Sequence, residues 1–177
     1  YLDGLVPLAY LLEDPRLIQK VKPWIEWILS SGQSNGWFGP AKNKDRWPLA
    51  VAMKVLTQYY EATGDGRALA VLKGYIMYLA GNPPDWPDKE WRGVRAGENV
   101  VSAIWYYRKT LDPDALKFAK SVFSSSFDWA AYFANFPYPR GIVEMGVKPS
   151  HPSHVVNIAM AIKYPGLRYA LTGDERF

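Results

Sequence analysis

The sequence YYEATGDGRAL at residues 59–69 places the end of one helix directly before the start of another. Gly64 suits the left-handed conformation that ends many helices, because it has no Cβ to clash with the backbone. Asp65 can cap the following helix by accepting a hydrogen bond from a free backbone N–H in its first turn. The stretch therefore predicts two helices joined by a very short turn.

The same punctuation occurs at three other places in the chain. Aligned on their aspartates, the four turns are 51, 47 and 62 residues apart; the aspartates are Asp14, Asp65, Asp112 and Asp174. After the first aspartate, Pro15 suits the first helical position, where its missing N–H does no harm. We interpret the spacing as an internal repeat of helical hairpins whose other connections vary in length.

The apolar pattern predicts helices of two alternating kinds. Inner helices, apolar nearly all round, are expected at 2–12, 48–62, 98–107 and 155–162, and amphipathic outer helices at 15–29, 65–79 and 112–123. Pro23 and Pro165 are expected to kink or break the helices that contain them. The sequence thus predicts an all-α fold in which hairpins form a ring.

Long connections alternate with the short turns. They are expected at 31–47, 82–97 and 127–153, the last with a short helix near 129–133. In a ring of hairpins, all of these connections would emerge on one face, and loops this long and aromatic are usually functional. We therefore expect a site where the long loops meet the N-terminal ends of the inner helices.

Composition narrows the classes of function. The 177 residues are 49% hydrophobic and 15% aromatic, and the eight Trp and twelve Tyr exceed what a core alone needs, which suits sugar binding. The net charge of +4 comes from scattered residues, so we expect no nucleic-acid partner. No apolar run approaches the ~20 residues that span a bilayer, so we expect no membrane partner.

Metal and redox chemistry are also constrained by composition. The chain has no cysteine and two histidines, which excludes a disulfide or thiolate metal site and disfavours a self-contained zinc site. The sequence begins inside one helix pattern and ends after another helix start, so we interpret residues 1–177 as part of a longer domain. The cellular compartment is left open.

Three groups of polar and aromatic residues are candidates for a binding site. They are Trp37, Asp45, Arg46 and Trp47 in the first long loop, Trp91, Arg95, Glu98 and Asn99 at the end of the second, and His151, His154 and Asn157 after the third. Each group also has a structural interpretation, as loop anchors, a helix cap, a first-turn acid or hydrogen-bonded core residues. His154 and Asn157, three apart, would share a helix face.

Glycoside hydrolysis usually needs two catalytic groups that flank the scissile bond. Asp45 and Glu98 are the two carboxylates that we nominate, although their spacing assigns neither a role. Asp3, near the start of the first inner helix, is a weaker candidate at the same end of the inner helices.

The motifs, in order, resemble a known family. They are YLDGLVPLAY at 1–10, SNGWFGP at 34–40, YYEATGD at 59–65, RAGEN at 95–99, HVVN at 154–157 and KYP at 163–165. This order is similar to the N-terminal half of the (α/α)₆ catalytic domain of β-L-arabinofuranosidase-type glycoside hydrolases, family 127 and its relatives. The resemblance implies a retaining hydrolase with a zinc-held cysteine nucleophile that would lie beyond Phe177. It also implies that His154 contacts a sugar hydroxyl, with help from Asn157, Glu98, Arg95, Asp45 and Trp37.

Three functions remain open at this stage. The first is a glycoside hydrolase that releases a terminal L-arabinofuranose-like sugar from a glycan, with zinc in the full-length protein. The second is another (α/α)₆ carbohydrate enzyme, an unsaturated-uronide hydrolase or a sugar epimerase, that needs no zinc. The third is a non-catalytic toroid that binds glycan or protein, or builds an assembly.

Overall fold

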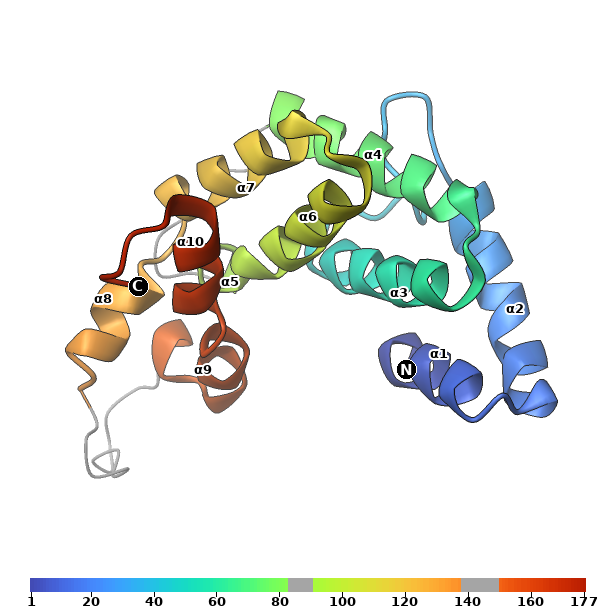
Figure 1. Ribbon diagram of the computed structural model, residues 1–177, viewed down its shortest axis with the longest axis horizontal. Helices are drawn as coiled ribbons and strands as arrows, with labels where there is room; N and C mark the ends of the chain where they lie inside the picture. Colours follow the sequence, from blue (N-terminus) through green and yellow to red (C-terminus); the bar gives the residue numbers. More distant parts are fainter. Residues whose placement is uncertain (83–90, 138–149) are drawn as a thin grey trace. The chain divides into compact units, whose positions relative to one another are not determined.

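A computed structural model describes residues 1–82, 91–137 and 150–177, and this part of the chain contains helices and no β-strand. The all-α class is therefore confirmed. The elements, traced in Figure 1, are α1 (Leu2–Leu11), α2 (Pro15–Ser30), α3 (Trp47–Thr63), α4 (Gly66–Gly81), α5 (Trp91–Arg95), α6 (Gly97–Thr110), α7 (Pro113–Ser125), α8 (Trp129–Ala134), the 3₁₀ turn η1 (His151–Ser153), α9 (Val155–Ala161) and α10 (Tyr164–Thr172).

The chain divides into two compact units. The N-terminal unit comprises residues 1–84 and 101–118, and the C-terminal unit comprises residues 85–100 and 119–177. The boundary passes through α6 and α7. Each unit is described separately below.

The four predicted turns are present and share one hydrogen-bond pattern. Each aspartate accepts a hydrogen bond from the backbone N–H two residues ahead, at 2.8 Å for Asp14, 3.0 Å for Asp65, and 3.1 Å for Asp112 and Asp174. In three turns the hydroxyl of a threonine two residues earlier accepts from the aspartate N–H; these are Thr63, Thr110 and Thr172. The predicted caps at Asp14 and Asp65 are therefore confirmed, and Asp112 makes the same contact before α7. No helix follows Asp174 in the described residues.

The residue before each aspartate adopts a left-handed conformation. Gly64 and Gly173 have φ of 69° and 68°, as the glycine in the motif predicts. In the other two turns Glu13 and Leu111 adopt φ of 50° and 57°, although an L-residue there costs roughly 1–2 kcal/mol. The hydrogen bonds of the aspartate therefore select the same turn with or without glycine.

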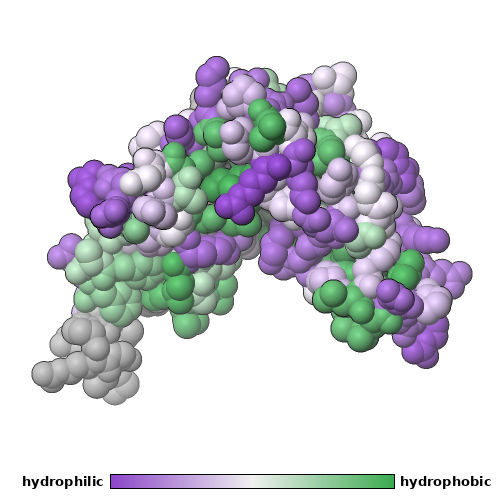
Figure 2. Space-filling model, in the orientation of Figure 1, coloured by the Kyte–Doolittle hydropathy of each residue, from purple (hydrophilic) through white to green (hydrophobic). Residues whose placement is uncertain are grey.

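In the N-terminal unit, α1 packs against α2 and α3, while α4 packs against α2 and α3. The core between them contains fully buried aliphatic side chains, among them Met53, Leu56, Leu72 and Ile76. Hydrophobic side chains also gather on the surface over α1, where Leu8 and Leu11 are exposed (Figure 2).

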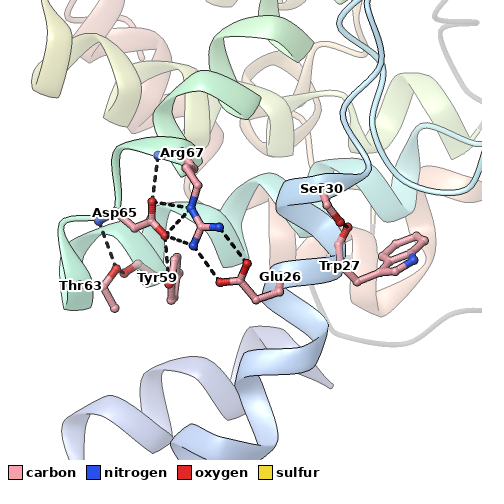
Figure 3. Close-up of polar contacts among 7 residues, drawn as sticks. All are labelled: Glu26, Trp27, Ser30, Tyr59, Thr63, Asp65 and Arg67. Atoms are coloured by element: carbon pink, nitrogen blue, oxygen red, sulfur yellow. Dashed lines mark hydrogen bonds and ion pairs between the residues drawn. The ribbon is translucent and has the colours of Figure 1, made fainter.

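Arg67 ties the second turn to α2. Its guanidinium donates two hydrogen bonds of 2.8 Å to the carboxylate of Glu26 and others to Asp65 (Figure 3). The hydrogen bonds from Arg67 lower the pKa of the Glu26 carboxyl. Because these groups are exposed to solvent, the ion pairs fix the geometry of the turn more than they stabilise the fold.

The C-terminal unit has its own core. Val94, Trp129, Ala161 and Tyr164 are buried together, and partly buried aromatic and aliphatic residues pack around them, including Phe123, Phe127, Tyr132 and Leu167. The indole N–H of Trp129 donates to the carbonyl oxygen of Val94 at 2.9 Å. Helix α8, expected near 129–133, is present because Asp128 accepts from the N–H of Ala131 at its start.

The structure differs from expectation at two places, the second connection and Pro23. The second connection, expected as a loop over 82–97, contains α5, and its residues 83–90 lie outside the described part of the chain. Most of the third, residues 138–149, also lies outside it. Helix α2 continues past Pro23, which was expected to kink or break it. Helix α9 ends at Ala161, and Pro165 occupies the first turn of the next helix, α10, as expected of a helix break at this proline. Within the described ranges, no helix is long and apolar enough to cross a bilayer.

Candidate functional site

Five of the predicted site residues lie together in the C-terminal unit. Helix α5 supplies Trp91 and Arg95, η1 supplies His151, and α9 with its N-cap supplies Asn157 and His154. The indole of Trp91 lies 4.5 Å from the ring of His151 and 5.3 Å from the ring of His154, centroid to centroid. The guanidinium carbon of Arg95 lies 4.1 Å from the Trp91 ring centroid, within the range of a cation–π contact.

Asn157 connects the elements that carry these side chains. It is fully buried, its side-chain oxygen accepts from Nε of Arg95 at 2.8 Å, and its side-chain nitrogen donates to the carbonyl oxygen of His151 at 2.8 Å. One amide thus fixes both the guanidinium of α5 and the backbone of η1. A buried amide with both ends paired is a rigid support for the more exposed residues above it.

His154 occupies the start of α9. Its Nδ1 accepts from the backbone N–H of Val156 at 3.3 Å, which leaves Nε2 as the ring nitrogen available to donate to a ligand. The side chain is exposed. His154 therefore presents an N–H donor beside Trp91.

Glu98 is held by two partners. Its Oε1 accepts from the hydroxyl of Tyr164 at 2.9 Å and lies 2.6 Å from Nζ of Lys163, and its side chain is 11% exposed. Burial, followed by the charge of Glu98, raises the pKa of the Tyr164 hydroxyl well above its ordinary value, so Tyr164 remains a donor. Glu98 thus has the geometry of a structural carboxylate that anchors α6 to α10.

Gly97 allows this contact to form. A Cβ at Gly97 would lie 2.7 Å from ring atoms of Tyr164, closer than carbon atoms approach. The start of α6 therefore depends on glycine to reach the Tyr164 ring. No role was predicted for Tyr164 or Lys163 from the sequence. Their only sequence indication was the KYP motif at 163–165, which follows α9.

The candidates of the first loop belong to the N-terminal unit. Trp37 is 8% exposed, and its ring packs edge-on against Tyr75 at 5.8 Å and Tyr78 at 5.3 Å. Asp45 accepts from the backbone N–H of Trp47 at 2.9 Å, where α3 begins. The structure thus shows the loop-anchor contacts that were the alternative interpretation of Trp37. Asp45 precedes the N-cap residue of α3, Arg46, and its bond is a turn contact rather than a helix cap.

In the part of the chain that the structure describes, no three His, Asp or Glu side chains are grouped as a metal site would need. Comparison with protein-family models, curated proteins and solved structures finds no significant match to this chain.

Proposed function

We propose that this chain is part of a carbohydrate-active enzyme of the (α/α)₆ type, a glycoside hydrolase that acts on a terminal L-arabinofuranose-like sugar. The observation that carries the proposal is the cluster of Trp91, Arg95, His151 and His154 on the buried Asn157. In this proposal the repeated hairpins form a ring, and the cluster is one wall of its sugar site.

The chemistry of the cluster suits a sugar. Trp91 is 42% exposed, and the part of its indole that Arg95 and His151 do not cover offers apolar surface on which the C–H groups of a sugar ring can pack. His154 offers a donor for a hydroxyl oxygen, and Arg95 is oriented by Asn157 beside the same ring. Aromatic stacking with a few fixed polar groups is the usual composition of a small-molecule site.

This wall would bind the sugar rather than cleave its bond. Glu98 is paired with Tyr164 and Lys163, which makes it a poor general acid. Under the proposal, the zinc-held cysteine implied by the resemblance comes from outside these 177 residues, since they contain no cysteine. The engagement of Glu98 equally favours a second candidate, a glycan-binding toroid without hydrolysis.

Saturation-transfer NMR tests the proposal on the 177-residue chain, with methyl β-L-arabinofuranoside as the probe. We expect transfer to the sugar with the unchanged protein and its loss in Trp91→Ala. The matched control is Trp24→Ala, because Trp24 is similarly exposed, at 54%, on α2. Absence of transfer, or equal transfer in Trp91→Ala, would sink the proposal.

His154→Ala provides a second test of the same site. We expect weaker binding of the methyl arabinofuranoside, with unchanged helix content by circular dichroism, because His154 is exposed at a helix start. An unchanged affinity would remove His154 from the site. Hydrolysis of an aryl arabinofuranoside by a longer protein that carries this segment would separate the two candidate functions.

A further inference from the structure

A hollow lies in the N-terminal unit, on the connection between α2 and α3. It has a volume of about 320 Å³ and is lined mainly by polar side chains; its lining is Gln33, Asn35, Trp37, Ala41, Asn43, Lys44, Arg46 and Tyr78. The connection that forms it runs beside α4 (Figure 1). No contact of this hollow enters the sugar site proposed above, so the inference below is independent of that proposal.

The wall of the hollow is fixed to α4. Gly36 has φ of 91°, and a Cβ there would lie 2.2 Å from the carbonyl oxygen of Gly74, so the backbones meet directly. A tight turn holds the tip, since the N–H of Gly36 donates to the carbonyl of Gln33 and the N–H of Gln33 to the carbonyl of Trp37. The hollow is thus largely preformed, as ligand sites usually are.

Cations supply the charge of the lining. Arg46 donates from Nη1 to the carbonyl oxygen of Asn82 at 3.1 Å, and its guanidinium carbon lies 5.8 Å from the ring centroid of Tyr78. These contacts hold one side of the guanidinium. Lys44 is a second, exposed cation. Asp45, between Lys44 and Arg46 in sequence, accepts a hydrogen bond through its carboxylate from the N–H of Trp47 at the start of α3.

A buried donor in the same wall lacks a partner. Trp37 is 8% exposed, and its indole Nε1 is buried without a hydrogen-bond partner. A ligand oxygen that reached this N–H would supply the hydrogen bond that it lacks. The side-chain amide of Gln33 adds a neutral donor and acceptor to the lining.

We propose that this hollow binds a small ligand through an oxyanion, either the carboxylate of an acidic monosaccharide or a free phosphate. Arginine recognises such groups because its planar donors match two oxygens of the anion, and Lys44 adds a point charge. The amides and the edge of Tyr78 suit the hydroxyls and C–H groups of an attached sugar.

Isothermal titration of the 177-residue chain with glucuronate, glucose and inorganic phosphate tests this inference. We expect glucuronate or phosphate to bind at least tenfold more tightly than glucose. Tighter glucuronate would identify an acidic sugar as the ligand class, and tighter phosphate would identify a free anion. Equal affinity for glucose and glucuronate with no phosphate binding, or no binding of either anion, would overturn the proposal.

Charge variants locate the binding. Arg46→Gln and Lys44→Gln should each weaken the anion at least threefold, and Arg46→Lys should lose less than Arg46→Gln. Lys22→Gln, which removes an exposed charge from α2, is the matched control and should leave the affinity unchanged. Because Lys44 is exposed, Lys44→Gln keeps the test valid if Arg46→Gln disturbs the fold. Equal affinities in all variants would place the anion elsewhere and reject the site.

Discussion

Trp37 and Trp91 both lie in long connections between helices, yet their surroundings differ. Trp37 is buried and packs edge-on against the tyrosines of α4. Trp91 is 42% exposed and stands among an arginine and two histidines, supported by one buried amide. A tryptophan in such a connection can therefore be buried against a neighbouring helix or exposed among polar side chains.

The largest expected difference is in stability. Trp37→Ala should lower the free energy of unfolding by about 3–5 kcal/mol, because it removes a large buried side chain and leaves a cavity. Trp91→Ala should cost less than about 1 kcal/mol, as surface changes usually do. Chemical denaturation of both variants would measure this. Similar losses would break the comparison.

The next largest losses of stability are expected from substituting the glycines that support the two regions, Gly36 and Gly97. Gly36→Ala should cost about 2–5 kcal/mol, because its Cβ would meet the backbone of Gly74 and its φ is 91°. Gly97→Ala should cost about 1–3 kcal/mol, since the clash is with the ring of Tyr164. Gly32→Ala is the control, with nothing within 4 Å of its Cβ. A larger fall in melting temperature for Gly97→Ala than for Gly36→Ala would contradict the expected order.

The next effect on stability is expected at Asn157, the buried amide beneath Trp91 and its polar neighbours. Asn157→Leu should cost about 1–3 kcal/mol, because it removes the amide that bonds Nε of Arg95 and the carbonyl of His151. Asn157→Asp keeps the acceptor for Arg95 and should weaken sugar binding less than Asn157→Leu. Asn135→Leu, at an exposed amide of α8, is the control. If Asn157→Leu has the same free energy of unfolding and the same sugar affinity as the unchanged chain, the amide does not support the cluster.

The smallest effect comes from two of the aspartate turns, one in each unit. Hydrogen bonds from the neighbouring arginine side chain and backbone lower the pKa of Asp14 and of Asp174 to about 2, from an ordinary value of 3.8. Because each folded pKa is depressed, the stabilisation is present above pH ~4 and is lost as the pH falls toward 2.

Asp14→Asn and Asp174→Asn should each lessen the loss of stability between pH 4 and pH 2, measured by denaturation across that range. Asparagine also caps helices, so the cap of α2 is retained in Asp14→Asn. A variant whose acid dependence equals that of the unchanged chain would show that its aspartate has an ordinary pKa in the folded protein.

The helices and turns could be predicted because their causes are local. Gly64, Asp65 and Pro15 act on their own backbone, so the predicted starts and ends agree with the structure within a few residues. The grouping of Trp91 with His154 followed from placing long loops on one face. Helix α5 was not expected, since it lies among the helix breakers of its connection and depends on contacts with η1 and α9.

The partners of the candidate residues could not be predicted. Whether Trp37 is buried depends on the close approach of Gly36 to Gly74, residues that are far apart in sequence. The pairing of Glu98 with Tyr164 spans 66 residues, and no local pattern encodes it. The ring of six hairpins and the arabinofuranosidase activity remain predictions from the resemblance.

The short turns also bear on the order in which contacts can form during folding. The turns at Asp14, Asp65 and Asp112 each join two helices that are adjacent in sequence, so bringing those helices together closes a short loop at a low cost in chain entropy. The bond between Arg95 and Asn157 joins residues 62 positions apart and closes a much longer loop. Proteins dominated by local contacts fold faster than those that depend on distant ones. The hairpins are therefore expected to form early, and the polar cluster that depends on Asn157 is expected to assemble last.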